Sequence, residues 1–205
     1  MNPQEAYDEL LELAREETVL ASCTDLLEWD EETFMPRGGV DNRAEQMEVL
    51  AGLLHERATS PRYGELLSIV EDSALVSDPI SVEAVNVREL RREYERELRL
   101  PADLVEEGAR VGTLASQAWA EAREAGDFAI FAPWLDRLFA LGREEADAVG
   151  FPETRYDAML EDYEPGMTAS RINRLFAGLK EALLPMVAEL SEPASVPIHV
   201  LKREF

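Results

Sequence analysis

Residues 101–126 read PADLVEEGARVGTLASQAWAEAREAG, and this stretch sets the predicted fold class. Pro101 is a favourable residue at the start of a helix, and Gly126 is a typical residue just after the end of one. The first turn is acidic, which suits the positive end of the helix dipole, and contains Asp103, Glu106 and Glu107. Apolar residues recur at helical spacing, at Leu104, Val111, Ala115, Trp119 and Ala122. The stretch therefore predicts one long amphipathic helix.

The same signals predict helices along most of the chain. Their ranges run from Asn2 toward Leu27, over 44–54, after Ser60–Pro61, after Asp78–Pro79 through the charged run 88–99, from Asp127 or Ala132 to Gly150, and from a Thr168 cap to Val187. The run 88–99 is charged nearly all round, which predicts an exposed helix with many ion pairs. Residues 29–42 contain Pro36, Gly38 and Gly39 and are expected to form a loop.

Signals for β-strands are nearly absent, because no extended run alternates polar and apolar residues with an enrichment of β-branched side chains. No internal repeat of about 34 or 40 residues is present, which argues against a helical solenoid. We therefore expect an all-α protein with a helical region over residues 1–190. Residues 191–205 contain Pro193 and Pro197 and little periodicity, which predicts an irregular tail with a truncated or frameshifted end.

The charge balance of the chain is strongly acidic, with 43 acidic residues against 20 basic ones and a formal net charge of -23. Such a surface repels phosphate backbones and anionic lipids, so we expect no nucleic-acid partner and no membrane partner. The only lysines are Lys180 and Lys202. A surface rich in glutamate and poor in lysine indicates either adaptation to high salt or the solvated helices of an arginine-favouring genome.

The terminus and the cysteine content predict a cytoplasmic location. The sequence begins Met1-Asn2-Pro3-Gln4-Glu5, without the basic and apolar regions of a secretory signal peptide. No run of 18 apolar residues is present, so no membrane-spanning helix is expected. Cys23 is the single cysteine, which excludes an intramolecular disulfide, and we expect it to be a small buried thiol.

A search for catalytic chemistry finds no complete constellation. The pentapeptide 55–59 reads His-Glu-Arg-Ala-Thr and begins like H-E-x-x-H, but Thr59 replaces the second histidine that would complete a metal-binding face. We therefore expect His55 to interact with the carboxyl end of its helix, and the other histidine is His199. An acidic cluster next to the predicted loop is interpreted as a solvated turn and contains Asp30, Glu31 and Glu32. No catalytic, cofactor-binding or metal-binding residue is assigned.

Two longer segments nevertheless carry a specific pattern. Residues 26–39 read LLEWDEETFMPRGG, and they fit the order W-D-x-E/Q-T-x-M-P-x-G-G. Residues 156–168 read YDAMLEDYEPGMT. Further matches follow in the same order, over 43–46, 50–56, 119–123, 128–135 and 143–144. Over about residues 5–190 the chain resembles the N-terminal part of carboxypeptidase Taq metallopeptidases.

This resemblance implies a larger, helical, zincin-type fold and an enzyme that removes residues from the C-termini of peptides. In the family a zinc or cobalt ion lies on two histidines of H-E-x-x-H and a downstream glutamate, and the complete enzymes are usually homodimers. No position of this sequence matches those ligands, so we expect no bound metal and no activity from this chain without the missing C-terminal part. The alternative is a stand-alone helical binding or regulatory module derived from the family.

The resemblance also implies which residues contribute to the substrate groove, because the N-terminal helices of the family wall and cover it. The candidates for the groove wall are Trp29, Asp30, Phe34, Met35, Pro36, Gly38, Gly39, Tyr156, Tyr163 and Pro165. We expect the rings of Trp29 and Phe34 to pack on neighbouring helices. Because part of the fold is missing, some large apolar residues should lack partners, and the candidates are Trp119, Trp134, Phe139, Phe176 and Leu183.

Overall fold

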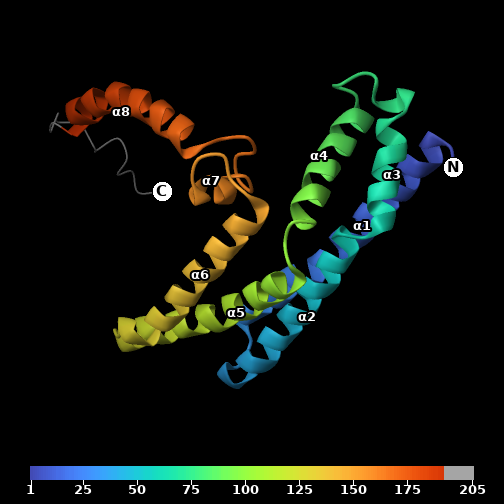
Figure 1. Ribbon diagram of the computed structural model, residues 1–205. Coiled ribbons are helices and arrows are strands. Elements are labelled where there is room, and N and C mark those ends of the chain that lie inside the picture. Colours follow the sequence, from blue (N-terminus) through green and yellow to red (C-terminus); the bar gives the residue numbers. More distant parts are fainter. Residues whose placement is uncertain (192–205) are drawn as a thin grey trace, which may run out of the picture. The chain divides into compact units, whose positions relative to one another are not determined.

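Residues 1–191 are described by the structure, a computed structural model, and they are almost entirely helical. The α-helices are α1 (Pro3–Thr33), α2 (Val40–Ala58), α3 (Pro61–Glu71), α4 (Val82–Glu97), α5 (Ala102–Ala125), α6 (Ala132–Val149), α7 (Arg155–Leu160) and α8 (Ala169–Ser191) (Figure 1). Short 3-10 helices lie between them, namely η1 (Arg37–Gly39), η2 (Ala74–Val76) and η3 (Phe128–Ile130). No described residue lies in a β-strand, so the prediction of an all-α protein is confirmed. The predicted tail lies outside the described residues except for Ser191, which ends α8.

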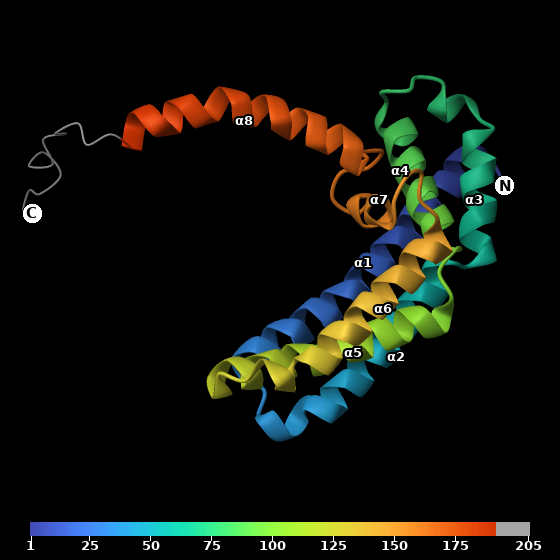
Figure 2. The ribbon, with the colours of Figure 1, turned by 60° about the vertical axis from the view of Figure 1, so that its left-hand side comes forward.

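The chain divides into two compact units, residues 1–150 and residues 151–205, of which the second is described to residue 191. In the first unit α2 and α5 share the largest helix–helix contact, and α1 packs on both α2 and α3. α4 packs on α3, and α6 packs on α5, and both pairs lie side by side in Figure 1 and Figure 2. In the second unit α7 contacts α8.

The core of the first unit lies where α1, α3 and α4 meet. Its buried residues are Ala6, Tyr7, Leu10, Tyr63, Leu66, Leu67, Val70 and Val87. The rings of Tyr63 and Tyr94 stack with centroids 5.8 Å apart, which adds an aromatic contact between α3 and α4. The core therefore fixes the N-terminal half of α1, and the C-terminal half of α1 is held by other contacts.

Helix ends largely follow the predicted signals. Asn2 and Glu5 form a reciprocal capping box at the start of α1, with Pro3 in the first turn. Ser60 caps α3 through its side chain, and Gly126 ends α5 in the left-handed conformation with a φ of 64°. Thr168 precedes α8 and its hydroxyl accepts from the backbone N–H of Arg171 at 3.3 Å. These boundaries were predictable because each rests on a local hydrogen bond.

Two predicted boundaries were wrong. α1 does not stop near Leu27 but continues to Thr33, and α2 begins at Val40, so the predicted loop over 29–42 shrinks to a tight corner. α4 begins after Ser81, whose side chain accepts from the N–H of Ala84 at 3.2 Å. Asp78, the residue predicted to start this helix, instead accepts from the N–H of Ile80 in a local turn. Ser81 is therefore the residue that caps α4. α7 was not predicted.

The charged run 88–99 is helical as far as Glu97, where α4 ends, and it carries ion pairs, including Arg91 with Glu71 on α3 at 2.6 Å. The helix is not exposed all round, however, because Ala84 and Val87 are buried and Tyr94 stacks on Tyr63. Cys23 also differs from its prediction, since it is exposed on the surface of α1. Within residues 1–191 no helix is both long and apolar enough to cross a membrane.

Candidate functional site

The corner between α1 and α2 contains the first predicted groove-wall segment. The backbone N–H groups of Phe34 and Met35 both donate to the carbonyl oxygen of Asp30, at 2.9 and 2.8 Å, which closes the last turn of α1. Pro36 cannot donate a backbone hydrogen bond and disfavours helix in the residue before it, so α1 ends here. The N–H of Gly39 then donates to the carbonyl of Pro36 at 2.8 Å and starts the turn into α2.

Gly39 relieves crowding at this corner, and its backbone angle is one that other residues also adopt. A Cβ atom at Gly39 would lie 3.3 Å from Cγ of Met35, which is a tight contact. A Cβ atom at Gly38 would meet nothing within 4 Å, and the residues with positive φ angles are elsewhere, at Gly126, Gly150 and Gly166. The Met35 side chain therefore packs under Gly39.

A buried arginine holds the corner together. Arg43 on α2 is only 7% exposed, and its guanidinium donates to the backbone carbonyl of Leu27 and to the carboxylate of Asp30. Its Nε atom donates to Oε1 of Gln46 at 3.1 Å. Asp30 therefore acts as the partner of a buried charge, and Arg43 connects the last turns of α1 to the first turn of α2.

The expected burial of the two aromatic rings at this corner was wrong. Trp29 is 54% exposed and Phe34 is 72% exposed. The rings pack on each other edge to face, with centroids 5.4 Å apart. The reason is the extra length of α1, which places Trp29 on the outer surface of a helix and not in a loop folded back on its neighbours. The corner thus presents an aromatic pair to its surroundings.

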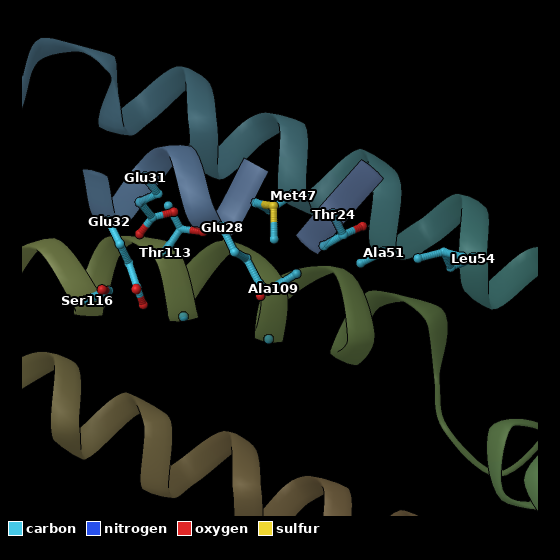
Figure 3. Close-up of a pocket in the computed structure, with 12 residues that line it drawn as sticks. Thr24, Glu28, Glu31, Glu32, Met47, Ala51, Leu54, Ala109, Thr113 and Ser116 are labelled. Atoms are coloured by element: carbon cyan, nitrogen blue, oxygen red, sulfur yellow. The ribbon is translucent and has the colours of Figure 1, made fainter. Parts of the chain in front are cut away.

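A cavity of about 370 Å³ lies beside this corner, between α1, α2 and α5. Figure 3 shows carboxylates of α1 above it and the hydroxyl-bearing side chains of α5 below. Its lining residues are Thr24, Glu28, Glu31, Glu32, Met47, Ala51, Leu54, Gly108, Ala109, Gly112, Thr113 and Ser116. The hydroxyl oxygen of Thr24 is buried and has no hydrogen-bond partner. The lining combines acidic groups with small side chains on α5, which leave the space open.

The acidic residues next to this cavity do not form the solvated turn that was expected. They lie in the last turns of α1, and Asp30 and Glu31 are half-buried. Burial raises the pKa of the Glu31 carboxyl above its ordinary value, and the charges of Glu28 and Glu32 add to this effect, while the Arg43 charge opposes it. Negative charge is therefore concentrated on one side of the cavity.

The second predicted segment lies around α7 and is organised by a buried aspartate. Asp157 is 3% exposed, and its carboxylate accepts from the backbone N–H groups of Glu153, Thr154 and Ala169, at 3.1, 2.8 and 2.7 Å. The N–H of Ala169, followed by those of Thr154 and Glu153, lowers the pKa of Asp157 against the opposing effect of burial. One side chain therefore caps α7 and also fixes the start of α8.

The remaining residues of this segment face outward. Tyr156 is 62% exposed and Tyr163 is 83% exposed, and Pro165 is exposed as well. Gly166 has a φ of 75°, and its N–H donates to Oε2 of Glu161 at 2.8 Å, so this turn requires a residue that accepts the left-handed conformation. The two tyrosines are available for contact with another molecule or another part of a larger fold.

His55 lies in the last turn of α2, as expected, and it has a hydrogen-bond partner that the sequence did not reveal. The ring is buried, and Nδ1 lies 2.9 Å from Oε2 of Glu97 at the end of α4. His55 therefore links α2 to α4. Across residues 1–191 no group of three or more His, Cys, Asp or Glu side chains is arranged to hold a metal ion.

Comparison with known proteins assigns the chain to a family. The family profile described as Carboxypeptidase Taq (M32) metallopeptidase matches residues 9–205. This chain belongs to the M32 family. It is 47% identical over 192 residues to Thermostable carboxypeptidase 1 of Thermus thermophilus. The alignment covers 89% of this chain and 38% of that protein. The resemblance inferred from the two sequence segments is confirmed.

Solved structures of M32 relatives share the fold. The crystal structure of BsuCP is 30% identical with a TM-score of 0.76, and the match covers 93% of this chain and 37% of that one. Metallocarboxypeptidase 1 of Trypanosoma cruzi is 32% identical with a TM-score of 0.70, over 98% of this chain and 39% of that one. The chain therefore spans between 37% and 40% of the length of the curated M32 relatives that it matches.

The structure groups the predicted M32 residues into two sets, one in each unit. The first set surrounds the corner between α1 and α2 and contains Trp29, Asp30, Phe34, Met35, Pro36, Gly38 and Gly39. The second set surrounds α7 and contains Tyr156, Tyr163 and Pro165. Sequence reasoning did not single out Arg43 or Asp157, although both lie inside the matched segments, because a buried charged residue has no periodic signal that separates it from a surface one.

Proposed function

We propose that this chain is the N-terminal part of a metal-dependent carboxypeptidase that releases C-terminal amino acids from peptides. The observation that carries the proposal is the match of the M32 family over residues 9–205, together with relatives named as carboxypeptidases. The chain spans less than half of each of those relatives. A complete enzyme would therefore combine this helical part with a larger remaining part of the family domain.

Residues 1–191 do not provide a ligand set that fits the metal of the family. The side chains of residues 1–191 provide no group of three suitable ligands. As the family resemblance implies, we propose that the zinc or cobalt ion is held by residues outside 1–191, and we assign no proton transfer and no step of peptide hydrolysis to residues 1–191.

The role that we assign to this chain is to wall the substrate groove. The support comes from the corner between α1 and α2, where Arg43 and Asp30 hold a fixed turn that presents the rings of Trp29 and Phe34. Exposed aromatic rings on a rigid helical corner offer a large apolar contact with little loss of conformational entropy on binding. In the second unit, considered by itself, Tyr156 and Tyr163 are exposed and offer a separate apolar contact surface.

The proposal also includes a cytoplasmic homodimer as the state of the complete enzyme. The single cysteine of the sequence is in keeping with a cytoplasmic location. The homodimer follows from the resemblance to the family, and light scattering of a complete enzyme would measure it.

A chimera tests the proposal. The matched part of the Thermus thermophilus carboxypeptidase is replaced by this chain, and the release of C-terminal residues from blocked peptides is measured with and without a chelator. We expect chelator-sensitive release by the chimera and none by the isolated chain. Trp29→Ala in the chimera should raise KM, whereas Trp119→Ala, which removes another half-exposed tryptophan on α5, should leave KM unchanged.

Two outcomes would contradict this assignment. Peptide cleavage by the isolated chain would place catalytic residues within it. A folded, metal-loaded chimera without activity would favour the alternative function, a helical binding or regulatory module derived from the family.

A further inference from the structure

The last described helix, α8, whose ribbon is drawn in Figure 2, has a sequence that places a continuous apolar stripe along its length. Residues at spacings of three and four form this stripe: Ile172, Leu175, Phe176, Leu179, Leu183, Met186, Val187 and Leu190. Apart from Ile172, each of them is exposed, from 40% at Leu183 to 75% at Leu190. The opposite side of the helix contains Arg174 and Glu181 together with the exposed Leu184, and Arg171 and Lys180 flank the stripe.

A helix of this kind normally depends on a partner. α8 contains no buried residue, although most of the stability of protein helices comes from packing of an amphipathic face. Pro185 lies within the helix and removes one of its backbone hydrogen bonds. Large contiguous apolar patches are uncommon on soluble monomers and usually mark interaction sites. The apolar face of α8 is therefore expected to be covered in the functional protein.

The comparisons indicate what covers it. The M32 match continues to residue 205, so α8 lies close in sequence to the last matched residue, and the chain spans at most 40% of the curated relatives. The absent part of the family domain is therefore larger than the chain itself. The stripe contains no charged residue, which is typical of the interior of a domain, whereas transient interfaces mix apolar and polar groups.

We propose that the apolar face of α8 is the surface on which the absent part of the carboxypeptidase domain packs. This inference rests on the proposed function, because it takes its partner from the family assignment. α8 then belongs to the interior of the complete enzyme, and its stripe connects the two parts of the domain.

The test compares two substitutions on α8 with a matched pair on its opposite side. Leu179→Gln with Leu183→Gln removes apolar groups from the stripe, and Arg174→Gln with Glu181→Gln is the control, because glutamine has a high helix propensity and the control pair leaves the net charge unchanged. Each pair is placed in the isolated chain and in the chimera with the Thermus thermophilus carboxypeptidase. The melting temperature, the molecular mass in solution and the fluorescence of an apolar dye are measured.

We expect the stripe pair to lower the melting temperature of the chimera by on the order of 10 °C. In the isolated chain the same pair should leave the melting temperature unchanged and reduce dye binding, since the stripe has no partner there. The control pair should change neither protein.

Several results would overturn the inference. A lower melting temperature of the isolated chain with the stripe pair would show that the face is already covered by another part of this chain. A dimer of the isolated chain that the stripe pair dissociates would identify a second copy as the occupant. An isolated chain that binds no dye, or a chimera that the stripe pair does not affect, would also refute it. An inactive chimera that still responds to the stripe pair would refute the proposed function alone.

Discussion

At the scale of single residues, the contacts that hold the candidate site differ from those that the sequence suggested. Trp29 and Phe34 were expected to be buried anchors, because large apolar rings next to Pro36 and two glycines usually pack inward. The structure exposes both rings and buries Arg43. Sequence patterns identify apolar residues that repeat along a helix, but they do not reveal a single arginine that is buried because a carboxylate and a backbone carbonyl accept its hydrogen bonds.

Replacing this arginine tests that role. Arg43→Ala leaves the carbonyl of Leu27 and the half-buried carboxylate of Asp30 without their donor, so we expect unfolding to become easier by about 3 kcal/mol, near the lower end for a broken buried pair. Denaturant unfolding measures the change. Arg37→Ala is the control, since Arg37 pairs with Glu124 at an exposed position of the same corner and should matter little. Equal effects of the two substitutions would contradict the role assigned to Arg43.

At the scale of helices, the ends that rest on local capping were predictable and the others were not. Ser60 and Gly126 mark helix ends through hydrogen bonds or backbone angles that their own neighbours determine. Pro36 stops α1, but its last turns before Pro36 are also held by Arg43 of α2, a contact that no local signal contains, and the start of α4 depends on a competition between Asp78 and Ser81. The six-residue helix α7 is too short for a periodic signal, and Asp157 stabilises it through three backbone N–H groups.

The connection between α7 and α8 should depend on pH. The pKa of Asp157 is lower in the folded chain than the ordinary value of about 3.9, so its contribution to stability is complete above that value and disappears as the pH falls through the folded pKa. Asp157→Asn should therefore speed amide hydrogen exchange at Thr154 and Ala169 at neutral pH. The difference from the original chain should shrink under acidic conditions below about pH 4. Glu164→Gln, at an exposed carboxylate of the same unit, should leave these rates unchanged.

At the scale of the whole molecule, the fold class and the family were predictable, and the pairing of helices was not. Periodicity defines an apolar stripe on each helix but does not state which other stripe covers it. The extensive packing of α2 on α5, which are far apart in the sequence, is one result that no local signal contained. The stripe of α8 has no covering helix in the described chain. Phe176 and Leu183 on this stripe were expected to lack partners, and both are exposed. Trp119 and Phe139 are exposed as well, whereas Trp134 is half-buried.

The net charge of -23 makes a prediction about salt. Arginine–carboxylate pairs are present on the surface, but acidic residues outnumber basic ones by more than two to one, so repulsion between carboxylates exceeds the attraction that pairing provides. The screening length of the solution falls from about 30 Å at 0.01 M salt to about 10 Å at 0.1 M. The added salt therefore removes most of this repulsion between exposed charges. The melting temperature of the chain should therefore rise over this range. The rise should vanish near pH 4.4, where the sequence carries no net charge, and a flat or falling curve at neutral pH would show that the ion pairs outweigh the excess of negative charge.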